Sequence, residues 1–266
     1  MQFWETWADL HTELTISTST LLAFLLVLAR VSGAFVFVPL PVKDAGPSIA
    51  RIVMALAVTI ALFPRWPSIT VHDAGVGLLL FWVISEAALG AAIGLMVSFL
   101  TEAMTFGAQI LGLQAGYGYA SIVDPTTQAD SEVLPVITQL TAGLLFFTMG
   151  LDRYVIRAFA ESLDKYSAGT FVLKPDLSTE VIHLAGSVFS VGLRLAFPVL
   201  GLLFMTDIAL ALVGRINSQL HLSMHAFPVK MLMTLVMLGT VLAVSPQLYQ
   251  AYAAEVFKAL HHSFLP

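Results

Sequence analysis

The chain has 266 residues, of which 58% are hydrophobic and 11% are charged. Soluble domains are roughly half apolar and about one-quarter charged, so this composition excludes an ordinary water-soluble protein. The net charge of −5, with no basic cluster, argues against a nucleic-acid partner. Because the chain has no cysteine, it can form no disulfide, thiol nucleophile or thiolate metal site.

Several separate apolar runs reach or approach the ~20 residues that cross a bilayer as a helix. The predicted fold class is therefore all-α, a polytopic integral membrane protein with about six to seven apolar segments in a single domain over residues 1–266. The first segment, Thr15 to Val38, contains Arg30 and ends at a proline-rich turn. The second, Ile49 to Phe63, is short for a crossing and stops at Pro64.

The third segment begins near Ala74 and carries small and polar residues at steps of four, which place them on one helical ridge. These residues are Glu86, Gly90, Gly94, Ser98 and Glu102. Two glycines four apart allow a neighbouring backbone to come close, so Gly90 and Gly94 predict a helix-packing face. Glu86 is a costly residue within a membrane unless it is paired, protonated or hydrated.

The stretch from Gly107 to Ile122 is glycine-rich and too polar for lipid. Glycine raises the free-energy cost of forming a helix. Irregular backbone at membrane depth needs protein or water around it. We therefore predict a non-helical plug that lines or blocks a passage; the alternative is a strained helix end packed against its own chain. The predicted plug residues are Gly107, Gln109, Gly112, Gln114, Gly116 and Gly118.

Three further apolar segments follow. They run from Val133 to Leu151, from Val181 to Gly214 with a kink expected at Pro198, and from Lys230 to Ala254 with an interruption expected at Ser245-Pro246. Between the first two lies a polar segment, residues 152–180. The positive-inside rule places this polar segment and the C-terminus in the cytoplasm, whether residues 74–123 cross once or form two arms.

Four ionisable residues interrupt apolar segments: Arg30, Glu86, Arg194 and Asp207. A transporter would use such residues as an ion path, whereas a multi-subunit complex would use them as buried pairs within or between chains. Composition by itself slightly favours the transporter. We expect each of the four to be paired inside protein and none to face lipid.

The residues that enzyme chemistry needs do not come together in this sequence. No Walker loop, dinucleotide fingerprint or nucleophile elbow is present. His221 and His225 are spaced four apart, but neither belongs to an HExxH pattern, so surface histidines are the favoured interpretation. The sequence therefore predicts a protein without catalytic activity and without a cofactor or metal.

One ordered set of motifs resembles a known family. It comprises Arg30 followed by PLPVK, then Glu86 before Gly90 and Gly94, then GAQILGLQAGYG with its DP turn, then LRLAFPV and RINSQLHLSMHAFPVK. Together these motifs resemble the flagellar biosynthetic protein FliR family, whose virulence-secretion counterpart is the T component of the type III export gate. The resemblance covers nearly the whole chain.

The resemblance implies a non-enzymatic, pore-forming subunit of the export gate in the bacterial inner membrane, at the flagellar basal body. It implies kinked helical hairpins and a single copy that assembles with FliP-like and FliQ-like subunits, near an FlhB-like subunit, to pass unfolded proteins outward. It further implies that the glycine-rich stretch seals the pore, and that Arg215 and Lys230 lie at subunit contacts. A secondary transporter for a small solute is the rival hypothesis.

Overall fold

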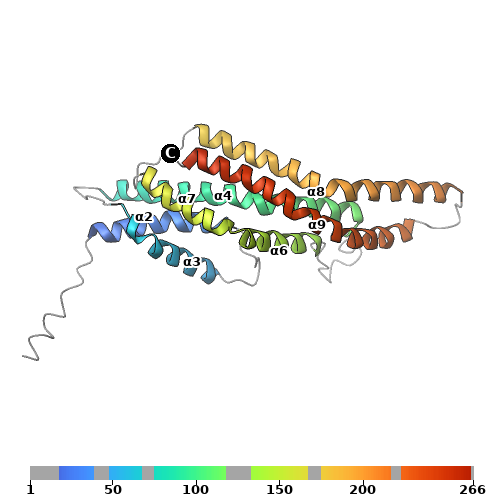
Figure 1. Cartoon of the computed structure of the whole chain (residues 1–266), viewed down its shortest axis with the longest axis horizontal. Coiled ribbons are helices and arrows are strands. Elements are labelled where there is room, and N and C mark those ends of the chain that lie inside the picture. The colour runs from blue at the N-terminus through green and yellow to red at the C-terminus, as the bar shows by residue number, and fades with distance from the viewer. Residues whose placement is uncertain are drawn as a thin grey trace, which may run out of the picture.

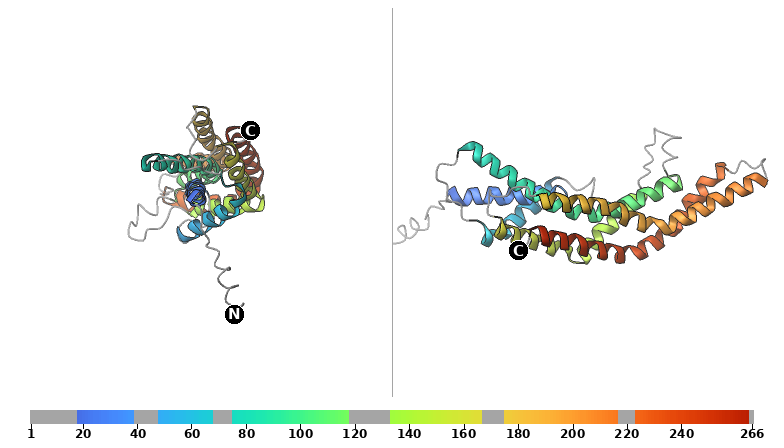
Figure 2. Two further views of the ribbon diagram at one scale, coloured as in Figure 1. Left: turned by 90° about the vertical axis from the view of Figure 1, so that its left-hand side faces the viewer. Right: turned by 90° about the horizontal axis from the view of Figure 1, so that it is seen from above.

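A computed structural model of the chain describes residues 18–38, 48–67, 75–117, 133–166, 175–216 and 223–264. In these ranges the chain forms seven α-helices and one short 3-10 helix, with no strand, which confirms the all-α prediction. The helices lie roughly along one axis and form an elongated bundle (Figures 1 and 2). Four of the described helices are long and apolar enough to cross a membrane.

The N-terminal part of the bundle contains α2 (Thr18–Phe35) and the shorter α3 (Ser48–Ala61), which pack together. A 3-10 helix, η1 (Phe63–Arg65), follows α3 because Pro64 cannot continue the hydrogen-bond pattern of an α-helix. The predicted shortness of the second apolar segment is therefore confirmed.

The helix α4 (Val76–Ala115) is continuous over 40 residues. The predicted non-helical course from Gly107 is wrong as far as Ala115, because this part of the stretch is helix with one face buried against its own chain. The helix ends at Gly116, whose φ of 88° lies in the left-handed region that glycine adopts most easily. Residues 75–117 therefore count as one segment and not as two arms.

Next come α6 (Val133–Thr148) and α7 (Leu151–Lys165), which meet at an angle of 66° and together are long and apolar enough for one span. The bend lies at Gly150, which has a φ of 69°. The segment predicted as polar thus begins as an amphipathic helix, with one face of α7 buried in the core through Val155 and Phe159.

The C-terminal half is a pair of long helices, α8 (Pro175–Ile216) and α9 (Ser223–Phe264), which run side by side in opposite directions (Figures 1 and 2). The interruption predicted at Ser245-Pro246 is wrong, since α9 continues through it. Pro246 has no N–H for the carbonyl oxygen of Leu242, and the Ser245 hydroxyl donates to that oxygen instead, at 2.9 Å.

Glycines bring α4 into backbone contact with α2. A Cβ atom at Gly90 would overlap the carbonyl oxygen of Arg30, and one at Gly94 would overlap that of Ala34. From the other helix, Gly33 approaches the carbonyl oxygen of Ala87 in the same way. The ridge predicted from Gly90 and Gly94 is therefore a helix-packing face.

A second close approach joins α4 to α8. A Cβ atom at Gly107 would lie 2.7 Å from the carbonyl oxygen of Gly192, and one at Gly192 would lie 2.8 Å from that of Ala103. Because α4 also packs against α6 and α9, it is the central element of the bundle.

We predict that Gly90→Ala separates α2 from α4 and lowers the free energy of unfolding by about 1–3 kcal/mol, the usual cost of overpacking. Gly77→Ala in the same helix is the matched control, because a Cβ atom there meets nothing within 4 Å. Alanine favours helix over glycine, so the control should gain up to about 1 kcal/mol. Denaturation of the purified chain in mild detergent measures both values; equal effects would refute the close approach.

Candidate functional site

The first cluster of functional interest is a buried ion pair between α2 and α4. The Nε atom of Arg30 lies 2.5 Å from Oε2 of Glu86, and both side chains are 1% exposed. Two charges so far from water are stable only when they neutralise each other and their remaining polar atoms are bonded. The expectation that these two residues are paired inside protein therefore holds for Arg30 and Glu86, which pair with each other.

The remaining donors of Arg30 reach α7 and the residue that follows it. Nη1 donates to the Ser162 hydroxyl at 3.2 Å, and Nη2 donates to the carbonyl oxygen of Tyr166 at 3.1 Å. A guanidinium has donors in a fixed planar fork, so one side chain can join three elements. Sequence reasoning missed Ser162 and Tyr166, since neither belongs to a motif and both lie far from Arg30 along the chain.

The second cluster lies where α4, α8 and α9 meet. The Nζ atom of Lys230 lies 2.8 Å from Oδ1 of Asp207, and Gln114 donates from Nε2 to Oδ2 of Asp207 at 3.2 Å. Asp207 is thus paired inside the chain, and its partner is Lys230, for which the family resemblance implies a subunit contact. The ammonium group of Lys230 bonds within its own chain, and Arg215 is exposed; a subunit contact remains a prediction for both residues.

A sequence signal for this second pair does exist. Asp207 and Lys230 lie at similar distances along the chain from the connection between two consecutive apolar helices. In antiparallel neighbours such positions fall at the same level, where opposite charges can meet.

Arg194 differs from the other three predicted charges because its side chain is exposed. In the part of the chain that the structure describes, no carboxylate lies within ion-pair distance of it. Pairing inside protein would therefore require a second protein chain, and it remains a prediction.

The end of α4 forms the base of the predicted plug. The aromatic ring of Phe227 in α9 packs where a Cβ atom of Gly116 would lie. The Tyr117 hydroxyl donates to the carbonyl oxygen of Met231 at 3.1 Å, and burial raises the pKa of this phenol. These contacts hold Gly116 and Tyr117 against α9.

The predicted plug residues therefore do not share one environment. Gly107 and Gly112 are buried in α4, whereas Gln109 is exposed on that helix. Gln114 bonds to Asp207, and Gly116 ends the helix. Gly118 lies outside the described residues, as does the rest of the stretch to Ile122. The non-helical course is wrong for residues 107–115, and a plug role of the stretch remains a prediction.

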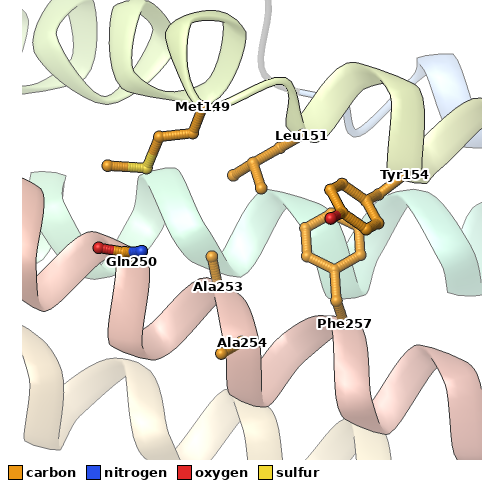
Figure 3. Close-up of a pocket in the computed structure, with 7 residues that line it drawn as sticks. All are labelled: Met149, Leu151, Tyr154, Gln250, Ala253, Ala254 and Phe257. Atoms are coloured by element: carbon orange, nitrogen blue, oxygen red, sulfur yellow. The ribbon is translucent and has the colours of Figure 1, made fainter.

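A groove between α7 and α9, with a volume of about 420 Å³, is lined by apolar and aromatic side chains and one amide (Figure 3). Tyr154 and Phe257 face each other across it, with ring centroids 5.5 Å apart. It contains no arrangement of nucleophile and base. The described residues also hold no cluster of His, Asp or Glu that could bind a metal. His221 lies outside the described residues, and nothing is described of the His225 side chain.

Comparison with known families matches residues 21–256 to "Bacterial export proteins, family 1". The chain belongs to this family. Among its relatives are the flagellar biosynthetic proteins FliR of Escherichia coli strain K12, 25% identical over 88% of each chain, and of Pectobacterium carotovorum subsp. carotovorum, 28% identical over 89% of each chain. FliR of Bacillus subtilis strain 168 is 26% identical over 81% of this chain and 84% of its own. The FliR-family resemblance inferred from the motifs is thus confirmed.

We predict that Arg30→Ala lowers the free energy of unfolding by about 3–5 kcal/mol, because it leaves the Glu86 carboxylate buried without a counter-charge. The double variant Arg30→Met/Glu86→Leu should lose less than the single variant, since no uncompensated charge remains. Detergent-based denaturation of the two variants measures the difference.

The matched control for this experiment is Arg65→Ala. It breaks the pair with Asp164, whose partners have 47% and 60% exposed side chains, and should cost about 0–1 kcal/mol. Equal losses for Arg30→Ala and Arg65→Ala would contradict the buried network.

Proposed function

We propose that the chain is a structural, pore-forming subunit of the flagellar protein export gate in the bacterial inner membrane, at the basal body. In this proposal it assembles as a single copy with FliP-like and FliQ-like subunits, near an FlhB-like subunit, to pass unfolded proteins outward. It acts as a component of an export apparatus and not as an enzyme. The observation that carries the proposal is the match to a bacterial export family over residues 21–256.

The flagellar assignment is supported by the relatives, which are named as flagellar biosynthetic proteins. An assembly role is supported by the surface of the chain. Along α8 and α9 many large apolar side chains are exposed, among them Phe197, Met205, Leu232 and Val236. Such a surface suits a chain whose helices pack against other apolar helices as well as against lipid.

The rival hypothesis is a self-contained secondary transporter. Transporters use intramembrane charges to bind ions or protons in a water-accessible site. Here Arg30 and Glu86 are sealed from water and bonded to each other, so this pair is better suited to holding helices together than to binding a solute. We place the polar segment 152–180 and the C-terminus on the cytoplasmic side.

We further propose that the pore seal is formed by the residues that follow Tyr117. Gly116 and Tyr117, which directly precede these residues, are held against α9 by their own contacts. In this proposal the seal moves aside when a substrate passes, while α4 keeps its packing. Glycine allows the chain a compact non-helical course, and the absence of charge in residues 118–122 gives ions no favourable contact.

The first test is copurification of the tagged full-length chain in mild detergent from cells that express its export genes. We predict a stable complex with two smaller hydrophobic subunits. A monodisperse monomer that moves a small solute when reconstituted in liposomes would instead support the transporter hypothesis.

The second test shortens the proposed seal. Deletion of residues 118–122 should make the assembled complex conduct ions and small solutes, while assembly remains intact because the contacts of α4 are untouched. A deletion of equal length at residues 169–173, between α7 and α8, is the control and should leave the complex closed. An assembled complex that stays closed after the first deletion would refute the seal.

A further inference from the structure

One face of α8 combines an exposed cation with an otherwise apolar surface. Between Glu180 and Asp207, Arg194 is the only Asp, Glu, Lys or Arg residue. It lies near the middle of α8, about 28 Å from Pro175 and about 33 Å from Ile216 at 1.5 Å per residue. A charge at this position in an apolar helix is costly when it faces hydrocarbon.

The side chains around Arg194 give it no polar surroundings. Leu193 and Phe197 are exposed beside it, and Phe197 is 72% exposed. At steps of four, Ser190, Arg194, Pro198 and Leu202 form one continuous exposed ridge. The hydroxyl of Ser190 is directed to its own helix, where it donates to the carbonyl oxygen of Ser187.

The backbone at the same point lacks a hydrogen bond. Pro198 has no N–H to donate to the carbonyl oxygen of Arg194, four residues earlier. In α9, Pro246 likewise leaves the carbonyl oxygen of Leu242 without a backbone donor, but there the Ser245 hydroxyl donates to that oxygen. Among the residues that the structure describes, no side chain donates to the carbonyl oxygen of Arg194. An unpaired guanidinium and an under-bonded carbonyl thus share one exposed site.

We propose that this face of α8 is a docking surface for an apolar helix of another subunit that carries an aspartate or glutamate opposite Arg194. Complementary charge identifies the occupant, because a carboxylate neutralises the guanidinium and can accept two of its hydrogen bonds. The apolar residues that flank Arg194 pack against the same helix and exclude water from the pair. The proposal rests on the proposed function, since it requires a hetero-oligomer.

Substitutions of Arg194 test whether its positive charge is needed for association with the partner subunits. Arg194→Ala should weaken association with the partner subunits by about 100-fold or more, because it strands a carboxylate in the interface. Arg194→Glu should weaken association at least as much, and Arg194→Lys should weaken it less than Arg194→Ala, because it keeps the charge but not the two parallel donors. The thermal stability of the isolated chain should not change in any of these variants, because Arg194 is exposed in it. Arg153→Ala, at an exposed arginine of α7, is the control.

A photo-crosslinking amino acid, p-benzoylphenylalanine, at position 197 of the full-length chain identifies the occupant in membranes. We expect mass spectrometry to find a crosslink to an apolar helix of another subunit, within one turn of an aspartate or glutamate. Crosslinks only to lipid, only within this chain, or to a helix without a carboxylate would overturn the proposal.

The two proposals fail in different ways. If the wild-type chain copurifies with its partners and Arg194→Ala does so equally well, the docking surface is wrong and the proposed function stands. A wild-type chain that remains a monomer would contradict both.

Discussion

The close approach of backbones on two sides of α4 is the constraint on which the rest of the structure depends. Gly90 and Gly94 admit the backbone of α2, and Gly107 meets Gly192 of α8. Where hydrocarbon surrounds the helices there is little hydrophobic drive between them, so contacts of this kind supply much of the attraction. Because α4 touches α2, α6, α8 and α9, these contacts set the positions of the charged residues.

The charges divide into two kinds according to that packing. Arg30 with Glu86, and Asp207 with Lys230, are paired inside the chain; the first pair joins α2 to α4, and the second joins the consecutive helices α8 and α9. Arg194 lies on the surface with an incompletely bonded backbone beside it. In the proposed export-gate subunit, the first kind would hold the helices of one chain together and the second would orient a partner.

Local patterns in the sequence were sufficient for the helices themselves and for the glycine ridge. They failed where a packing contact or a side-chain hydrogen bond outweighed the low helix propensity of a glycine or proline. Glycine costs about 1 kcal/mol in a helix, yet α4 continues through Gly107 because the missing side chain lets α8 approach. Pro246 does not break α9, because the adjacent Ser245 supplies the missing donor. The pairing of Lys230 with Asp207 has a sequence signal, their similar distance from the connection between α8 and α9, but this signal has meaning only if the two helices are antiparallel neighbours.

The central claim is that residues 107–115 are packed helix. Hydrogen–deuterium exchange of the purified chain in mild detergent tests it most directly, through the peptide that contains these amides. The structure predicts exchange as slow as in the buried middle of α4, because each amide is bonded within the helix and one face is covered by α8 and α9. Exchange as fast as in an unstructured peptide would contradict the account.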